Sequence, residues 1–260
     1  MLSLPFDFPK PAVFYYDRVN PESITGQQLD ALLALGWYRM HQNVFTTSHV
    51  ELGEIYRVHW LRYPVQSVRA HRSHQRIRRR NHPFTVSIEP FSSIGLAHHQ
   101  LHQKYRAAID FDGALSIEEC LFGEPPVRNN IFQTHCISVY DRGNLIAAGY
   151  FDTGETAAAS ILHFFHPAYK RYSLGKYLIL LTLDFLNNNG YRLYYPGYVV
   201  EGLSKMDYKL FLGREQAQYF HPSSAQWLPF EDSILHKPTN SDGNISGADP
   251  IHTDFTHFDV

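Results

Sequence analysis

The spacing of apolar residues is most regular in the second half of the chain. Residues 134–140 and 145–152 are short, strand-forming runs, and an Asp-Arg-Gly-Asn sequence separates them. A short connection containing Gly between two such runs is typical of a hairpin. A third apolar run covers residues 157–165, and a helical run from 172 to 187 follows it. Asn-Asn-Gly at 188–190 is a helix stop signal, so the pattern predicts three strands and then one helix.

The first half of the chain predicts smaller elements of both kinds. Residues 27–35 have the amphipathic spacing of a short helix that Gly36 ends, and residues 95–108 predict a second helix. Three further runs predict strands: Trp37–Thr46, Glu54–Tyr63 and Phe84–Pro90. We expect residues 1–28 to form an extended arm and the polar residues 236–260 to form a largely disordered tail.

The stretch from Tyr194 to Lys209 contains a strand that its own sequence interrupts. An aromatic strand begins at residues 193–195, Pro196-Gly197 breaks it, and residues 198–200 resume it. Because Pro lacks a ladder donor and Gly allows unusual backbone angles, the break predicts a bulge. Three charged residues follow within five positions: Lys205, Asp207 and Lys209. Two interpretations stay open at this point, an edge strand followed by a solvated turn or an interrupted strand that forms the lip of a pocket.

Charge and length narrow the class of protein. The 260 residues are enough for one large domain or two small ones with an ample core. A formal net charge of -2 argues against a uniformly basic nucleic-acid binder but allows a local basic patch. Such a patch lies at residues 69–80, RAHRSHQRIRRR. Guanidinium groups pair bidentately with phosphate oxygens, so this run favours contact with a phosphate backbone over a solvated helix or strand edge.

The cysteines and histidines give no metal pattern. Cys120 and Cys136 match neither a disulfide framework nor a zinc site, so we expect two reduced, buried thiols in a cytoplasmic protein. His98 and His102 have the i, i+4 spacing of a metal pair but no H-E-x-x-H arrangement, which favours a solvated polar helix face. We therefore predict no metal and no cofactor. Neither a signal peptide nor a membrane-spanning segment is expected.

The order of the regular elements matches the core of the GNAT acyltransferase fold, in which a helix N-terminus beside a splayed strand receives the acyl donor. The helix entry, KRYSLGKY, resembles the R/Q-x-x-G-x-G/A turn whose amides hold the CoA pyrophosphate in that fold. It has Arg171, Ser173 and Gly175, but Tyr177 replaces the second small residue. The pattern therefore predicts the fold and leaves the acyl donor open.

We accordingly predict an α+β protein with a GNAT-like mixed sheet flanked by helices and a small N-terminal α+β region. The expected division is an N-terminal region at 1–80, the GNAT-like domain at 81–235, and the tail at 236–260.

The chain resembles the arginyl-tRNA–protein transferase family, and its bacterial leucyl/arginyl branch in particular. The family's Y-x-G-Y strand corresponds to residues 195–198, and its K-M-x-Y-K segment corresponds to residues 205–209. Its D-P turn appears as His166-Pro167, and its R-x-x-R-R-N segment appears at residues 76–81. Two features depart from the family. Residues 56–65 contain no cysteine where the family carries a cysteine cluster, and the region 112–130 matches poorly.

The resemblance implies transfer of arginine or leucine from the 3′ end of an aminoacyl-tRNA to the N-terminal α-amine of an acceptor protein, a reaction of the N-end rule pathway. It assigns catalysis to Lys205, Tyr208 and Glu201. Substrate binding is assigned to Tyr195, Gly197, Tyr198, Lys209, Ser173 and Gly175. Contact with tRNA is assigned to Arg76, Arg78, Arg79 and Arg80. No covalent nucleophile is implied, and no Ser–His or Cys–His triad is visible.

Two other functions remain as alternatives. The first is a GNAT acyltransferase that uses acyl-CoA on a small amine. The second is a catalytically silent relative that binds charged tRNA, which the missing cysteines favour.

Overall fold

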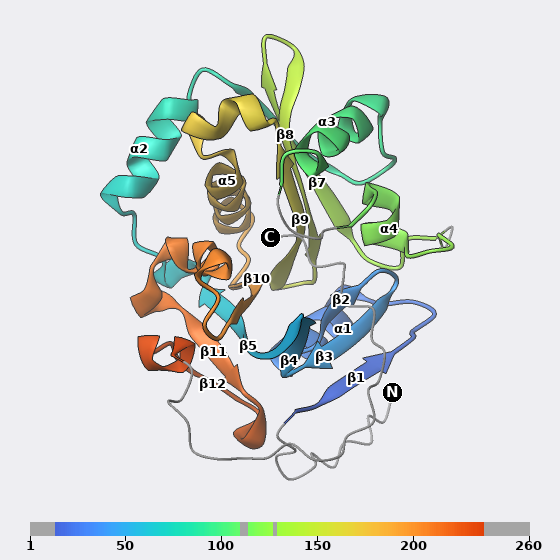
Figure 1. The fold of residues 1–260 in the computed structure, drawn as a ribbon, viewed down its shortest axis with the longest axis vertical. Helices are drawn as coiled ribbons and strands as arrows, with labels where there is room; N and C mark the ends of the chain where they lie inside the picture. Colours follow the sequence, from blue (N-terminus) through green and yellow to red (C-terminus); the bar gives the residue numbers. More distant parts are fainter. Residues whose placement is uncertain (1–13, 110–113, 127–128, 237–260) are drawn as a thin grey trace.

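A large mixed sheet forms the centre of the protein, with helices on both of its faces (Figure 1). The computed structural model describes residues 14–109, 114–126 and 129–236. Within these ranges the sheet has nine strands in the order β12-β11-β5-β10-β9-β8-β7-β6, and β4 pairs with β5. The strands are β4 (His49–Leu52), β5 (Glu54–Pro64), β6 (Thr85–Pro90), β7 (Thr134–Asp141), β8 (Asn144–Thr153), β9 (Ala157–Phe165), β10 (Leu193–Val200), β11 (Gln218–His221) and β12 (Gln226–Pro229). Only β9 and β10 pair in parallel among these described strands.

The helices divide between the two faces of this sheet. Their bounds are α1 (Gly26–Ala34), α2 (Arg72–Asn81), α3 (Leu96–Arg106), α4 (Ile117–Phe122) and α5 (Leu174–Asn188). Phe151 of β8 is buried in the same cluster as Leu178 of α5, whereas its neighbour Tyr150 is buried with Leu101 of α3. Successive side chains of a strand point to opposite faces, so α5 and α3 cover opposite sides of the sheet. The predicted α+β class, a mixed sheet flanked by helices, is confirmed.

A second, smaller sheet packs beside the large one and consists of β1 (Tyr16–Val19), β3 (Asn43–Thr47) and β2 (Tyr38–Met40). The single strand predicted at 37–46 is therefore wrong. His41 has a positive φ of 56°, which turns the chain back and makes the run a hairpin of β2 and β3.

The two sheets share a core. The ring of Tyr38 stacks on Trp60 of β5 with 3.7 Å between ring centroids. The predicted domain boundary at residue 80 separates β5 from β10 in sequence, yet these two strands pair in the same sheet. The domain division stays a prediction, and it does not separate two independent sheets. Residues 1–13 of the expected arm and residues 237–260 of the expected tail lie outside the described residues.

The prediction that the second helix carries a solvated polar face is wrong. His102 on α3 is 2% exposed, and its ring packs against Phe164 with 5.2 Å between centroids. His98 places Nε2 3.1 Å from the hydroxyl of Ser138. Because these histidines share a helix face with buried Leu101 and Tyr105, that face packs onto the sheet instead of meeting water.

Three other expectations meet the structure in the described ranges. Neither Cys120 nor Cys136 forms a disulfide in the described ranges; Cys120 is buried as expected, whereas Cys136 is only half-buried. No three His, Cys, Asp or Glu side chains gather in a way that could hold a metal ion there, and the absence of a metal stays a prediction. A search of the same residues finds no helix with the length and apolar character needed to cross a membrane.

Candidate functional site

The two parallel strands β9 and β10 part shortly after they meet. They pair only from Ala157 and Leu193 to Ala159 and Tyr195. Beyond this point each strand carries one extra residue relative to its other neighbour. The bulge in β9 lies between Ser160 and Leu162, opposite β8, and the bulge in β10 lies between Tyr194 and Gly197, opposite β5. Bulges bend a strand, so two of them at the same level open the sheet.

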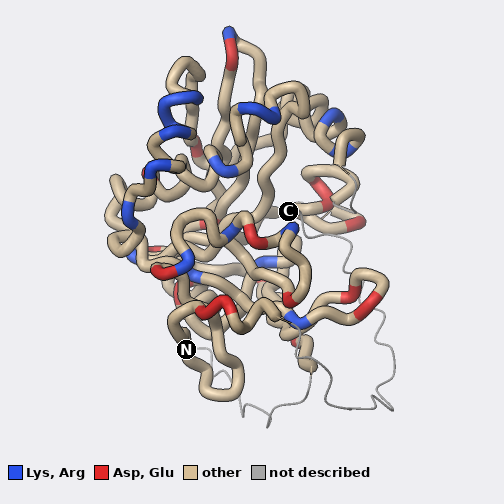
Figure 2. Tube along the Cα trace, turned by 60° about the vertical axis from the view of Figure 1, so that its left-hand side comes forward, with Lys and Arg blue, Asp and Glu red and all other residues tan. Residues whose placement is uncertain are grey.

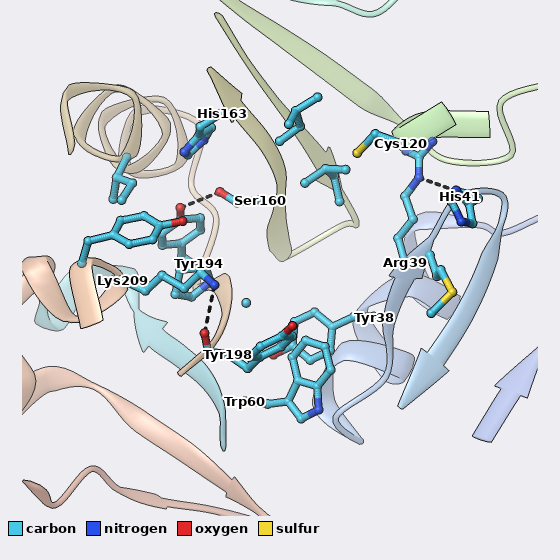
Figure 3. A pocket seen from close by; sticks show the side chains of 17 residues that line it. Tyr38, Arg39, His41, Trp60, Cys120, Ser160, His163, Tyr194, Tyr198 and Lys209 are labelled. Atoms are coloured by element: carbon cyan, nitrogen blue, oxygen red, sulfur yellow. Dashed lines mark hydrogen bonds between the residues drawn. The ribbon is translucent and has the colours of Figure 1, made fainter. Parts of the chain in front are cut away.

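The interrupted strand is therefore an interior strand with neighbours on both sides, and its interpretation as an edge strand is wrong. A cavity of about 70 Å³ lies where β9 and β10 part (Figure 3). This space would hold a few waters or one small reacting group. The lining residues are Tyr38, Arg39, Met40, His41, Trp60, Cys120, Ser160, Ile161, Leu162, His163, Ile179, Tyr194, Pro196, Gly197, Tyr198, Tyr208 and Lys209.

Lys209 brings an amine to one wall of this cavity. It belongs to a 3₁₀ helix, η3 (Ser204–Leu212), and its Nζ donates to the Tyr198 carbonyl at 2.9 Å. Gly197 has a φ of +102°, which only glycine adopts without strain, and its missing side chain faces the Lys209 methylenes. Burial lowers the pKa of Lys209 to about 7. No Asp or Glu lines the cavity among the described residues, so this amine has no carboxylate partner there.

Arg39 forms part of the opposite wall and is fully paired. Its guanidinium donates to Asp152 Oδ1 at 2.9 Å, to the Thr134 hydroxyl at 3.0 Å, and to the Leu121 carbonyl at 2.7 Å. The side chains of Arg39 and Asp152 are each 1% exposed. The Arg39 guanidinium therefore links β2 to β7, β8 and α4, and the Asp152 carboxylate neutralises its charge.

Two hydroxyls and one imidazole complete the polar lining. Ser160 and Tyr194 lie 2.6 Å apart, oxygen to oxygen, across the point where the strands part. His163 places Nε2 out of contact with solvent and without a hydrogen-bond partner among the described residues. The pKa of His163 is lowered to about 4, first by burial and then by the charge of Lys209. The imidazole is consequently neutral near neutral pH.

The predicted site residues separate into those that reach the cavity and those that do not. Gly197, Tyr198, Tyr208 and Lys209 line it. Tyr195 does not: it is buried in the cluster that contains Leu33 and Phe220, whereas its neighbour Tyr194 points to the other face of β10 and lines the cavity.

Neither Lys205 nor Glu201 lines the cavity. Lys205 is exposed on η3. Glu201 lies at the end of β10, where its Oε1 is 3.3 Å from His59 Nε2 and 3.9 Å from Arg57 Nε. The third charged residue of the segment, Asp207, pairs with Arg214 at 3.2 Å. A catalytic role for Lys205 or Glu201 therefore has no support from their position.

Ser173 and Gly175 lie at the start of α5 and outside the cavity lining. Ser173 adopts the left-handed conformation, with φ 55° and ψ 48°, and precedes the first helical residue. A side chain at Gly175 would approach the Phe165 ring at 3.4 Å, so this glycine allows close packing of α5 on β9. Their assignment to substrate binding stays a prediction.

The basic run forms α2, whose arginines do not all face solvent. Figure 2 shows blue segments following one another along this part of the chain. Arg76 and Arg79 are exposed, whereas Arg78 turns toward α5 and donates from Nε to Asp184 Oδ2 at 3.2 Å. Arg80 is exposed and donates to the Arg171 carbonyl. Arg78 is thus tied to the fold, and the free basic face is narrower than the sequence predicts.

Sequence reasoning missed the cavity lining outside the K-M-x-Y-K segment. His163, Ser160 and Tyr194 were not singled out. One signal was present, because Ser160 and His163 are the polar residues within the apolar run AAASILHFF of β9. A polar residue inside a buried strand either finds a partner or faces a site. Tyr38 and Trp60 carried no such signal, since aromatic residues are common in cores.

The parallel strands of the large sheet part around a small polar cavity. Comparison with known proteins indicates which family this region resembles. Residues 97–218 match the family described as arginine-tRNA-protein transferase, C terminus. The expected resemblance to the arginyl-tRNA–protein transferase family is confirmed over this region, which includes both parting strands and Lys209.

Individual relatives show the same likeness over different lengths. The chain is 23% identical to the aspartate/glutamate leucyltransferase of Paracoccus denitrificans, over 94% of this chain and 90% of that protein. It is 32% identical to arginyl-tRNA–protein transferase 1 of Saccharomyces cerevisiae, over 36% of this chain but only 19% of the yeast protein. Among solved structures, L-PGS from Bacillus licheniformis matches 55% of this chain and 46% of its own, with 13% identity and a TM-score of 0.38. The names of the sequence relatives indicate a transferase.

Proposed function

We propose that this protein transfers an amino acid from an aminoacyl-tRNA to the N-terminal α-amine of an acceptor protein, and that the bond forms in the cavity between β9 and β10. The observation that carries the proposal is the buried Lys209 amine, which lies in the matched region and faces the cavity. A cytoplasmic location and a place in the N-end rule pathway belong to the same proposal.

The chemistry needs little beyond positioning and proton transfer. The aminoacyl ester is already activated, so holding the two substrates together supplies much of the rate enhancement. The attacking α-amine has an ordinary pKa of about 8 and must be neutral to attack. A lysine whose pKa is lowered to about 7 can accept the amine proton at neutral pH and return it to the departing 3′ oxygen. We assign this role to Lys209 in place of Lys205 and Glu201.

The α2 helix supports the proposed partner. Arg76 and Arg79 project from its exposed side, where phosphate groups can approach them. Arg78 contributes to the same helix by fixing it to α5 through Asp184. We therefore propose that the acceptor end of the tRNA follows the exposed side of α2, and that Arg78 acts through the position of the helix.

The test is a transfer assay with labelled Leu-tRNA and Arg-tRNA, using peptides with varied N-terminal residues. We expect labelled peptide, and we expect Lys209→Met to lower kcat by about 100-fold or more, the usual contribution of a general base. The matched control is Lys205→Met, an identical change four residues away on the exposed side of the same 3₁₀ helix.

The outcomes separate the candidate functions. Equal activity of the two variants would contradict the role of Lys209. Charged tRNA that binds without any transfer would identify the silent relative. Acylation of the peptide from acetyl-CoA, with no use of tRNA, would identify the acyl-CoA acyltransferase.

A further inference from the structure

His163 is a half-buried residue that the proposed roles of Lys209 and α2 leave unused. Its Nε2 is shielded from solvent and lacks a hydrogen-bond partner among the described residues. Buried polar atoms in folded proteins are nearly always paired, so an unpaired one that lines a cavity is a candidate to bind a group that enters the cavity. The His163 ring lines the same cavity as Lys209 (Figure 3).

The backbone holds this imidazole in place. The bulge at Ile161 keeps Ser160 and His163, three residues apart, on the α5 side of β9. His163 lies opposite Gly149 of β8, where an added Cβ would come within 2.7 Å of the ring carbon Cδ2. The imidazole therefore packs directly against this glycine, and a larger residue at 149 would collide with it.

Charge decides what this nitrogen can bind. Lys209 is a cation or a neutral amine, Arg39 is neutralised by Asp152, and no carboxylate lines the cavity among the described residues. A substrate ammonium would therefore be buried without a counter-charge, which is costly. A neutral amine has two N–H donors and one lone pair, and it suits a cavity with two neutral acceptors.

We propose that His163 receives and orients the acceptor α-amine as a neutral amine. This inference rests on the proposed function. One N–H of the amine donates to His163 Nε2, the second donates to neutral Lys209, and the nitrogen lone pair points at the ester carbonyl carbon. As the C–N bond forms, Lys209 takes the proton from the amine nitrogen. The ester C–O bond then breaks, its electron pair goes to the 3′ oxygen, and Lys209 returns the proton to that oxygen. His163 stays neutral throughout, in keeping with its low pKa.

A direct test observes His163 without any transfer. The ¹⁵N resonances of His163 are recorded in labelled protein and assigned by their loss in His163→Gln. We expect the signature of a neutral imidazole at pH 6, and a shift of Nε2 when a peptide with a free N-terminus is added. An N-acetylated peptide of the same sequence should leave Nε2 unchanged. An equal shift with both peptides, or no shift with either at a concentration that saturates binding, would overturn the proposal.

Steady-state kinetics supply the second test. His163→Leu should raise the KM for the acceptor peptide by about tenfold, the usual effect of one lost hydrogen bond, and leave the KM for charged tRNA unchanged. His163→Gln retains a polar group on a side chain that can reach toward the Nε2 position, and it should recover most of the acceptor affinity. Equal changes in the two KM values would show that His163 only supports the fold. Absence of transfer by the unaltered protein would refute the proposed function, whereas the ¹⁵N experiment would still decide the role of His163.

Discussion

Arg39 and Lys209 are two buried basic residues on opposite walls of one cavity, and they differ in whether a carboxylate pairs with them. Arg39 donates to an aspartate, a hydroxyl and backbone carbonyls, and its pairing with Asp152 is completely buried. Lys209 donates to one backbone carbonyl and has no carboxylate partner in the described ranges.

The difference shows how burial separates structural from chemical roles. A buried charge with a complete set of partners stays charged and holds elements together. A buried amine without a counter-charge loses its proton easily and becomes available for proton transfer. The first kind of group should matter most to stability, and the second should matter most to activity.

The largest expected effect comes from breaking the pair. Asp152→Asn leaves the Arg39 charge buried with no carboxylate, and the free energy of unfolding should fall by about 3 to 5 kcal/mol. Urea unfolding followed by fluorescence measures this change. Replacing both partners, as in Arg39→Met with Asp152→Leu, should recover part of the loss because no charge is then left unpaired. A loss below about 1 kcal/mol in the single variant would show that the pair is not the link described here.

Replacing Lys209 should raise the free energy of unfolding, whereas replacing Asp152 should lower it. The unfolded chain keeps the ordinary lysine pKa of 10.5, whereas the folded value is about 7. Between these values the unfolded state binds more protons, so the stability of the unaltered protein rises with pH. Lys209→Met removes this dependence, so its gain in stability over the unaltered protein should be about 4 kcal/mol larger at pH 6 than at pH 10.

Thermal or urea unfolding at several pH values measures this difference. Lys205→Met, on the exposed side of η3, serves as the control and should show no such trend. A Lys209→Met variant that is less stable than the unaltered protein at pH 6 would mean that the lysine is charged and paired.

The smallest effects are expected on α2. There too, a paired arginine should matter to stability, and exposed arginines should matter to binding. Arg76→Ala with Arg79→Ala should flatten the slope of log affinity for charged tRNA against log salt by about one to two units, since each lost phosphate contact removes roughly 0.7 to 0.9. Arg78→Ala removes the partially exposed pair with Asp184 and should cost only about 0.2 to 1 kcal/mol of stability.

Nitrocellulose filter binding over a range of salt concentrations measures the slope. If Arg78→Ala flattens the salt slope as much as the double variant does, Arg78 contacts phosphate directly. The division between a structural Arg78 and tRNA-binding Arg76 and Arg79 would then be wrong. Transfer from a minimal aminoacyl-nucleotide donor should be unaffected by the double variant.

Much of the fold was predictable because local patterns and global structure agree. The strands β7, β8 and β9, the turn at residues 141–144, and the end of α5 all appear where the sequence places them. The bulge at Pro196-Gly197 was also predictable, because a residue without an N–H and one without a side chain interrupt a ladder in any context. The strands β11 and β12 were not predicted, and they are short strands at one side of the sheet.

The sequence by itself determined the kinds of element, the interruption of β10 and the chemical groups near residues 205–209. Only the tertiary structure decided which of those groups meet. Successive residues of a strand face opposite sides of the sheet, so Tyr194 lines the cavity and Tyr195 does not. The bulge in β9 shifts the alternation of the later residues of that strand, so His163 lines the same cavity as Ser160. Burial then separated two lysines four residues apart, one exposed and one with a lowered pKa. Solvation depends on every element packed around a side chain, and no local stretch of sequence contains that information.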